Sequence, residues 1–185
     1  MITIETFGNS VKIFKMEKLI EEILSIVRKI KKEEFEKIEK LIKKREKIFV
    51  YGLGRSGLVG RCFCMRLFHL GFNSYFVGET ITPAFTEKDL MIFISKTGER
   101  PILLELAKIC KRKKGKILTI TSNKKSKLSK ISDYLVHIPC GNSIQFGNSL
   151  FEQVCFLFLE GFVQFYIEKN KIDYNFMKKR HTNLE

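Results

Sequence analysis

The stretch Val50-Tyr51-Gly52-Leu53-Gly54-Arg55-Ser56-Gly57 joins an apolar, β-branched run to a glycine-rich turn. The run from Lys47 to Tyr51 predicts a strand, and a helical pattern begins near Leu58. A strand, a turn and a helix in this order present backbone N–H groups and a helix N-terminus, which together can hold a phosphate. The stretch therefore predicts a phosphate site at the end of a buried strand.

Strands and helices alternate along the chain beyond this stretch. Short runs rich in Ile, Val and Phe predict strands at 47–51, 74–77, 90–94, 116–120 and 134–137. Helical patterns predict helices at about 57–70, 99–114, 126–131 and 148–169. We therefore expect an α/β fold with a doubly wound, flavodoxin-like five-stranded parallel sheet and helices on both faces. Ligands of such sheets bind at the carboxyl ends of the strands.

The two ends of the chain add to this sheet. Residues 1–46 contain two patterns at helical spacing, the first formed by Ile13, Met16, Ile20, Ile23, Val27 and Ile30. Residues 171–185 form a basic tail, which alone reads as a solvated and frayed end. We expect residues 1–185 to form one domain, with an N-terminal helical extension and a C-terminal tail.

Composition limits the classes of protein to consider. The net charge of +14 suits nucleic acid, a membrane surface or small anionic substrates. The acidic and polar residues of Met1–Gly8 do not resemble a signal peptide. Five cysteines without a Cys-x-x-Cys motif predict reduced thiols in a cytoplasmic protein and no metal site. In the most basic stretch, 29–47, glutamates interleave the lysines as on a solvated, salt-bridged face, so we expect no nucleic-acid partner.

The last long helix is apolar on almost every side. Between Leu150 and Ile167 it is interrupted by Glu152, Gln153, Glu160 and Gln164, which argues against a membrane span. A helix without a polar face must be buried all round. We expect it to lie in a subunit interface; the alternative is the central core helix of a monomer.

The glycines of the opening stretch also match another ligand class. Gly52-x-Gly54-x-x-Gly57 has the spacing of a dinucleotide fingerprint, and Glu79 follows the second strand, where a ribose-binding acid is expected. These residues alone leave an NAD-dependent or flavin enzyme as a rival interpretation.

Hydroxyl residues recur after the next strands, and this repetition favours a smaller ligand. Ser95-Lys96-Thr97-Gly98-Glu99 follows the third strand, and Thr121-Ser122-Asn123 follows the fourth. Each Ser or Thr alone is more commonly a helix cap. Three such turns at one sheet edge fit one compact phosphomonoester better than a dinucleotide.

These three turns resemble the phosphosugar-binding turns of the SIS (sugar isomerase) domain, over about residues 35–170. The stretches Val77–Pro83, Ser149–Gln153 and Arg180–Glu185 are similar to those of the stand-alone 6-phospho-3-hexuloisomerases. That family interconverts D-arabino-3-hexulose 6-phosphate and fructose 6-phosphate without a cofactor. The chain departs from the family at Lys96, at Arg100 and in the Gln145–Ser149 segment, which lacks the usual Pro-Met-Gly.

The resemblance implies roles for particular residues. Glu152 is the candidate base of an enediolate mechanism, and His69, ahead of His181, is the candidate for opening the sugar ring. Related isomerases use a histidine from a neighbouring subunit, and the resemblance leaves open which subunit supplies it here. The implied substrate-binding residues are Gly52, Gly54, Arg55, Ser56, Ser95, Thr97, Gly98, Glu99, Thr121, Ser122, Thr80, Thr82, Arg180 and His181. No cofactor or metal is implied.

The resemblance also implies self-association, as a dimer or tetramer with active sites near subunit interfaces. Three other functions remain open at this point. They are another phosphosugar isomerase, of the arabinose 5-phosphate type, a non-catalytic phosphosugar-binding module, and an NAD-dependent oxidoreductase.

Overall fold

Five short parallel strands form the centre of the protein in a computed structural model that describes residues 10–184. They are β1 (Ile48–Gly52), β2 (Ser74–Phe76), β3 (Leu90–Ile94), β4 (Lys116–Thr121) and β5 (Tyr134–His137). Their order in the sheet is β2-β1-β3-β4-β5, and each neighbouring pair is parallel. This is the flavodoxin-like order, which confirms the predicted fold class.

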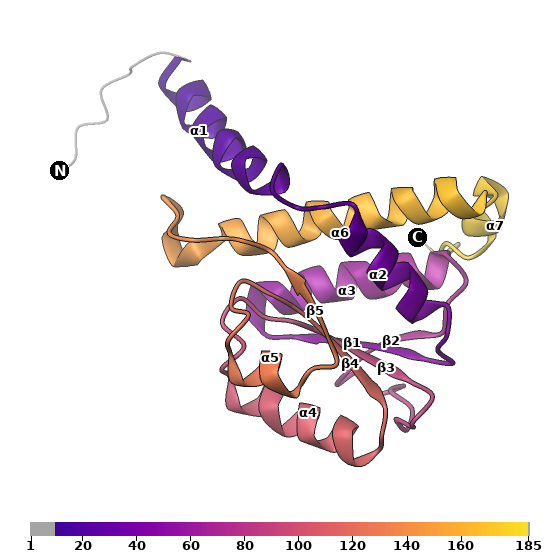
Figure 1. The fold of residues 1–185 in the computed structure, drawn as a ribbon. Coiled ribbons are helices and arrows are strands. Elements are labelled where there is room, and N and C mark those ends of the chain that lie inside the picture. The colour runs from indigo at the N-terminus through magenta and orange to yellow at the C-terminus, as the bar shows by residue number, and fades with distance from the viewer. Residues whose placement is uncertain (1–9, 185) are drawn as a thin grey trace.

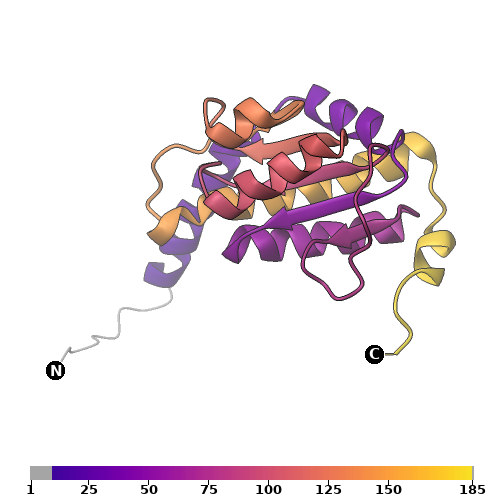
Figure 2. The ribbon, with the colours of Figure 1, turned by 90° about the horizontal axis from the view of Figure 1, so that it is seen from below.

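Helices cover both faces of the sheet, as Figures 1 and 2 show. α2 (Glu33–Ile42), α3 (Gly54–His69) and α6 (Leu150–Asn170) lie on one face. α4 (Pro101–Arg112) and α5 (Lys127–Ile131) lie on the other. α1 (Ser10–Val27) packs on α6, and α7 (Tyr174–Lys179) packs near the end of α3. A single 3₁₀ turn, Phe146–Asn148, precedes α6.

The sheet separates two hydrophobic cores. The larger core lies beneath α2, α3 and α6 and includes Phe63, Phe151 and Phe162, all fully buried. The smaller core lies beneath α4 and α5 and includes Phe49 and Phe93. Because β3 is buried along its whole length, its sequence is apolar without alternation, as expected for a parallel strand covered on both sides.

α6 serves mainly as a core helix. Nine of its residues are buried in the protein, and only Phe156 and Leu157 stand out as large exposed apolar side chains, at 42% and 49% exposure. By length and composition α6 is apolar enough to cross a membrane, but half of its apolar window is buried inside this protein. Most of α6 is therefore a core helix of the monomer, which was the alternative to the expected subunit interface.

Some boundaries differ from the predicted ones. α3 begins at Gly54, three residues before the expected start at residue 57, because Gly54 adopts a positive φ of 54° and turns the chain directly into the helix. The tail, expected to be frayed, contains α7, whose first turn is capped by the side chain of Asp173. On α1, Met16 and Ile20 are exposed although they were expected on its apolar face, and the side chain of Ile13 lies outside the described residues.

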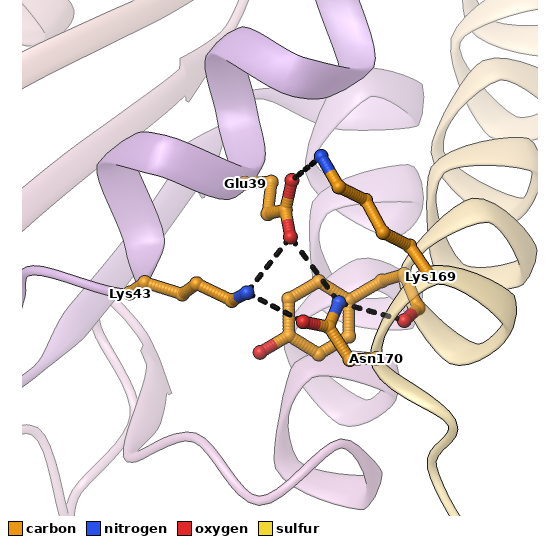
Figure 3. A network of polar contacts seen from close by, with 5 residues as sticks. Glu39, Lys43, Lys169 and Asn170 are labelled. Atoms are coloured by element: carbon orange, nitrogen blue, oxygen red, sulfur yellow. Dashed lines mark hydrogen bonds and ion pairs between the residues drawn. The ribbon is translucent and has the colours of Figure 1, made fainter.

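A buried carboxylate on α2 joins that helix to the end of α6 (Figure 3). Glu39 is 3% exposed and accepts hydrogen bonds from Lys43 Nζ (2.8 Å), Lys169 Nζ (2.7 Å) and Asn170 Nδ2 (3.2 Å). Burial alone would raise the pKa of Glu39, but the bonds from Lys169, Lys43 and Asn170 outweigh it and lower the pKa to about 2. The extension is therefore tied to the domain by a charged contact as well as by apolar packing.

Candidate active site

A cavity of about 610 Å³ opens at the carboxyl ends of β1 and β3. Its position is the one expected for a ligand site in an open parallel sheet. The chain segments that form it are the turn after β1, the turn after β3 and the segment before and at the start of α6. Its lining residues are Leu53, Gly54, Arg55, Ser56, Ile94, Ser95, Lys96, Thr97, Arg100, Leu103, Gly147 and Glu152.

The turn after β1 brings the first turn of α3 against the strand end. A Cβ at Gly52 would lie 2.8 Å from the carbonyl oxygen of Ser56, and one at Gly57 would lie 2.6 Å from that of Gly52. Only glycine permits this approach. Within the described chain no side chain caps the N-terminus of α3, where Leu53 is the N-cap residue. The first N–H groups of α3 therefore face the cavity edge without a side-chain acceptor, as an anion site requires.

Glu152 is held on the cavity wall by two residues of this same turn. Ser56 Oγ donates a 3.0 Å hydrogen bond to Glu152 Oε1, and Arg55 Nε donates to Oε2 at 3.3 Å. The Glu152 side chain is 15% exposed, whereas that of Arg55 is 50% exposed. We expected Ser56 to face a phosphate; the structure instead directs its hydroxyl to the candidate base. The arrangement leaves an oriented carboxylate beside a cation, which suits proton transfer next to a developing negative charge.

The turn after β3 forms the opposite wall. Ser95 Oγ accepts a hydrogen bond from the N–H of Gly98 (3.1 Å), and Gly98 has a positive φ of 65°. Among the described residues no side chain caps α4, which begins at Pro101 after the N-cap residue Arg100. Lys96, Thr97 and Arg100 line the cavity here. This wall therefore combines a helix N-terminus, a hydroxyl and two cations, the groups that bind a phosphate dianion.

The turn after β4 supports the second turn and does not line the cavity. Thr121 Oγ1 donates to the carbonyl oxygen of Lys96 (3.0 Å) and accepts from the N–H of Asn123 (3.1 Å). The N–H of Ser122 donates to the same carbonyl oxygen (3.2 Å). Glu99, also expected to bind substrate, accepts from the N–H of Lys127 and so caps α5. The third hydroxyl turn thus shapes the site from behind.

Thr80 and Thr82 lie at the edge of the sheet, after β2. Thr82 Oγ1 donates to the carbonyl oxygens of Glu79 (2.6 Å) and Phe76 (3.2 Å), and it lines a separate pocket of about 260 Å³. Glu79, the candidate ribose-binding acid of the dinucleotide interpretation, forms an ion pair with Arg61 in the same region. This segment does not join the lining of the main cavity.

The candidate histidines lie together at the other end of α3. His69 is 6% exposed, and its ring stacks on that of His181 with 5.2 Å between centroids. Arg180 Nε donates to the carbonyl oxygen of Phe68 (2.6 Å). Burial lowers the pKa of His69, as do the charges of Arg66, His181 and Arg180. At 1.5 Å per residue, His69 is about 20 Å along α3 from Ser56, so one chain does not bring His69 and Glu152 together.

Six lining residues were absent from the predicted set. Lys96 and Arg100 were noted only as departures from the family, and the other four are Leu53, Ile94, Leu103 and Gly147. Gly147 carried a signal, since a glycine inside the unusual Gln145–Ser149 segment indicates a positive φ, which is 64° in the structure. The other three are apolar and resemble any core residue in the sequence. In the described part of the chain no group of three or more His, Cys, Asp or Glu residues is arranged to hold a metal ion.

Known sequences match this chain over most of its length. The SIS domain model matches residues 40–155. The 3-hexulose-6-phosphate isomerase of Methanocaldococcus jannaschii is 35% identical over 163 residues, covering 80% of this chain and 81% of that protein. The 3-hexulose-6-phosphate isomerase of Bacillus subtilis is 36% identical over 165 residues, covering 84% and 89%.

Solved structures share the whole fold. One is a hypothetical protein of Methanococcus jannaschii, for which a function as 3-hexulose-6-phosphate isomerase was inferred from its structure. It is 34% identical and has a TM-score of 0.84, over 92% of this chain and 99% of that one. An Escherichia coli CFT073 protein solved in complex with a phosphosugar is 20% identical and has a TM-score of 0.80, over 95% and 100%. Relatives named 3-hexulose-6-phosphate isomerase thus match most of the chain at about 35% identity, and the chain belongs to the SIS domain family of sugar isomerases.

Proposed function

We propose that this protein interconverts D-arabino-3-hexulose 6-phosphate and fructose 6-phosphate without a cofactor. One observation carries the proposal: Glu152, oriented by Ser56 and Arg55, faces across one cavity to a wall with the features of a phosphate site. The choice of substrate is supported by the relatives that are named for this reaction and are about 35% identical to this chain.

The reaction needs one base that acts at two adjacent carbons. Glu152 removes the proton from C2 of the 3-ketose, and the electron pair moves into a C2–C3 double bond as the C3 carbonyl becomes an enediolate. The same carboxyl group returns a proton to C3, while the hydroxyl proton on the C2 oxygen passes to the C3 oxygen and the C2 oxygen becomes the new carbonyl, so that no atom or electron is gained or lost. Arg55 lines the cavity beside Glu152, and its positive charge stabilises the enediolate oxygens.

The phosphate is held at the wall formed by the turn after β3. The N-terminus of α4 and the hydroxyl of Thr97 supply hydrogen-bond donors, while Lys96 and Arg100 supply charge. This placement sets the phosphate against one wall and the ketose carbons toward Glu152 on the other. Lys96 and Arg100, where the chain departs from its family, thereby strengthen the binding of the phosphate.

Ring opening of fructose 6-phosphate is assigned to His69 of a second copy of the chain. Since His69 lies about 20 Å along α3 from Ser56, and Ser56 bonds Glu152, a single copy cannot present both His69 and Glu152 to one sugar. Burial and neighbouring charges lower the pKa of His69, so its imidazole is neutral and able to accept a proton at neutral pH. An apolar groove beside Glu152, lined in part by Leu58, Phe156 and Leu157, supports self-association as a dimer or tetramer.

The direct test is an isomerase assay. Fructose 6-phosphate and 3-hexulose 6-phosphate are each incubated with the protein in a chelator, without nicotinamide, and both sugars are followed. We expect interconversion in both directions, and its loss in Glu152→Gln. Turnover of arabinose 5-phosphate alone would assign a different isomerase, and turnover that requires added NAD would overturn the proposal.

A further inference from the structure

One carboxylate of α1 holds the loop that leads into α6. Glu22 Oε2 accepts hydrogen bonds from Ser143 Oγ (3.0 Å) and Gln145 Nε2 (3.1 Å), and Glu22 Oε1 accepts from the N–H of Ile144 (3.1 Å). Three consecutive residues of the loop are thus bound by one side chain from more than 120 positions away in the sequence. α1 and this loop lie side by side at one end of α6 (Figures 1 and 2).

The loop in turn reaches the two residues that carry the proposed chemistry. Gln145 Oε1 accepts from Ser149 Oγ (2.7 Å), and Ser149 is the N-cap residue of α6, the helix that bears Glu152. The carbonyl oxygen of Gly147 accepts from Arg55 Nη2 (2.7 Å), while Arg55 Nε donates to Glu152 (3.3 Å). Arg55 is therefore held between the loop and the candidate base.

The chemistry of Glu22 fits a fixing role. Its side chain is half-buried, and the three donors that it accepts from are neutral groups of one loop. Hydrogen bonds to an ionised acceptor are about twice as strong as neutral ones, so this carboxylate fixes the loop more firmly than an amide would. Gly147, with its positive φ, places its carbonyl oxygen toward Arg55 only while the turn keeps this shape.

We propose that Glu22 is a positioning residue for the active site, acting through Gln145 and Gly147 on Arg55 and thereby on Glu152. The inference rests on the proposed isomerase function of the cavity. It gives α1 a part in activity although none of the described side chains of α1 lines that cavity.

The test compares Glu22→Gln with Glu21→Gln, a matched change at the exposed neighbour on the same helix. We expect Glu22→Gln to lower kcat about tenfold while KM changes less than about threefold, because a small misplacement of reacting groups slows the chemistry and the phosphate wall is untouched. Glu21→Gln keeps the wild-type kcat. Wild-type kcat in Glu22→Gln, or the same loss in both variants, would overturn the proposal.

A reciprocal exchange tests the contact itself. Gln145→Glu alone places two carboxylates side by side and is expected to lower kcat at least as much as Glu22→Gln. Combining Glu22→Gln with Gln145→Glu lets the new amide at position 22 donate to the new carboxylate, which can still accept from Ser149. We expect the double variant to recover most of the kcat lost in either single variant; a double variant as slow as the product of the two losses would contradict the coupling.

A second measurement needs no turnover and separates this proposal from the proposed function. Hydrogen exchange at the Ile144 amide, followed by NMR, is expected to be about tenfold faster in Glu22→Ala than in the wild type, because that N–H loses its acceptor. If the wild-type protein isomerises no sugar phosphate, the function fails and this exchange rate still decides whether Glu22 holds the loop. Unchanged exchange would overturn the proposal whatever the activity.

Discussion

Ser56 and Glu152, 96 positions apart in the sequence, are joined by a 3.0 Å hydrogen bond from Ser56 Oγ to Glu152 Oε1. The bond connects the turn after the first strand with the last long helix. It leaves Glu152 Oε2 to Arg55, so that each carboxylate oxygen has its own donor. Rotation of the carboxylate is therefore restricted from both sides.

The first prediction concerns this bond. Ser56→Ala removes one of the two donors to Glu152, and we expect kcat for the isomerisation to fall about tenfold as the base loses its fixed orientation. Glu152→Gln removes the base itself and should lower kcat about a thousandfold. Steady-state kinetics at saturating substrate measure both losses, and circular dichroism checks that both variants fold. Equal losses in the two variants would mean that Ser56 does more than orient Glu152.

The second prediction concerns the charge of the phosphate wall. Arg100→Thr removes the charge and leaves a hydroxyl, and we expect KM for fructose 6-phosphate to rise about tenfold with little change in kcat, because a charge-assisted contact with the phosphate is lost. Arg112→Thr, at the exposed far end of α4, is the matched control and should leave KM unchanged. The difference in KM should shrink at high salt, since exposed charges are screened. A KM for Arg100→Thr equal to that of the wild type would place Arg100 outside the phosphate site.

The third prediction tests whether His69 acts in the site of a second copy. His69→Ala should slow the conversion of fructose 6-phosphate more than the reverse direction, since the 3-ketose cannot close the same five-membered ring. Hybrids of His69→Ala with Glu152→Gln chains should regain turnover, to about a quarter of the wild-type rate in a randomly mixed dimer. A mixture no more active than its parent variants would show that the two residues do not meet across an interface.

The fourth prediction concerns the tail. Removing residues 178–185 deletes the Arg180 contact with Phe68 and the His181 ring that stacks on His69. We expect lower isomerase activity, with the free energy of unfolding changed by less than about 1 kcal/mol because the tail is exposed. Burial and the charges of His181 and Arg180 lower the pKa of His69, so an NMR titration should show this pKa rising after the deletion. Removal of residues 183–185 alone serves as the control.

The fifth prediction concerns stability at low pH. The pKa of Glu39 is lowered to about 2, so its contribution to stability is complete above its ordinary pKa and is lost as the pH falls toward 2. Glu39→Gln should cost about 2 kcal/mol at pH 7 and progressively less below pH 4, as measured by urea unfolding. Glu105→Gln, which breaks an exposed ion pair with Lys108, is the control and is expected to change the free energy of unfolding much less, because solvent screens that pair. A cost for Glu39→Gln that is the same at pH 7 and pH 3 would exclude this linkage.

The fold could be predicted from the sequence because its signals are local. The fully buried strands are short apolar runs, and the glycines at 52, 54 and 57 mark the turn whatever lies around it. The element type follows from such neighbouring residues, while boundaries depend on single φ angles, as the start of α3 at Gly54 shows.

The direction of each side chain in the site could not be predicted in the same way. Ser56 was expected to face a phosphate and instead bonds Glu152, because the packing of α6 on α3 decides which acceptor its hydroxyl meets. Thr121 and Glu99 are in the expected turns but bond neighbouring backbone groups. Glu22 showed no signal at all, since an acidic residue on a solvated helix looks the same whether or not a loop distant in sequence closes over it.

The place of Glu152 on α6 has a consequence for the synthesis of the protein. The turns after β1 and β3 leave the ribosome before α6 does, so the phosphate wall is made well before the base. However, α6 also supplies much of the larger core, and without it one face of the sheet stays open to water. A nascent chain that lacks α6 therefore has an incomplete larger core and no catalytic base. Docking of this one helix completes both the core and the active site.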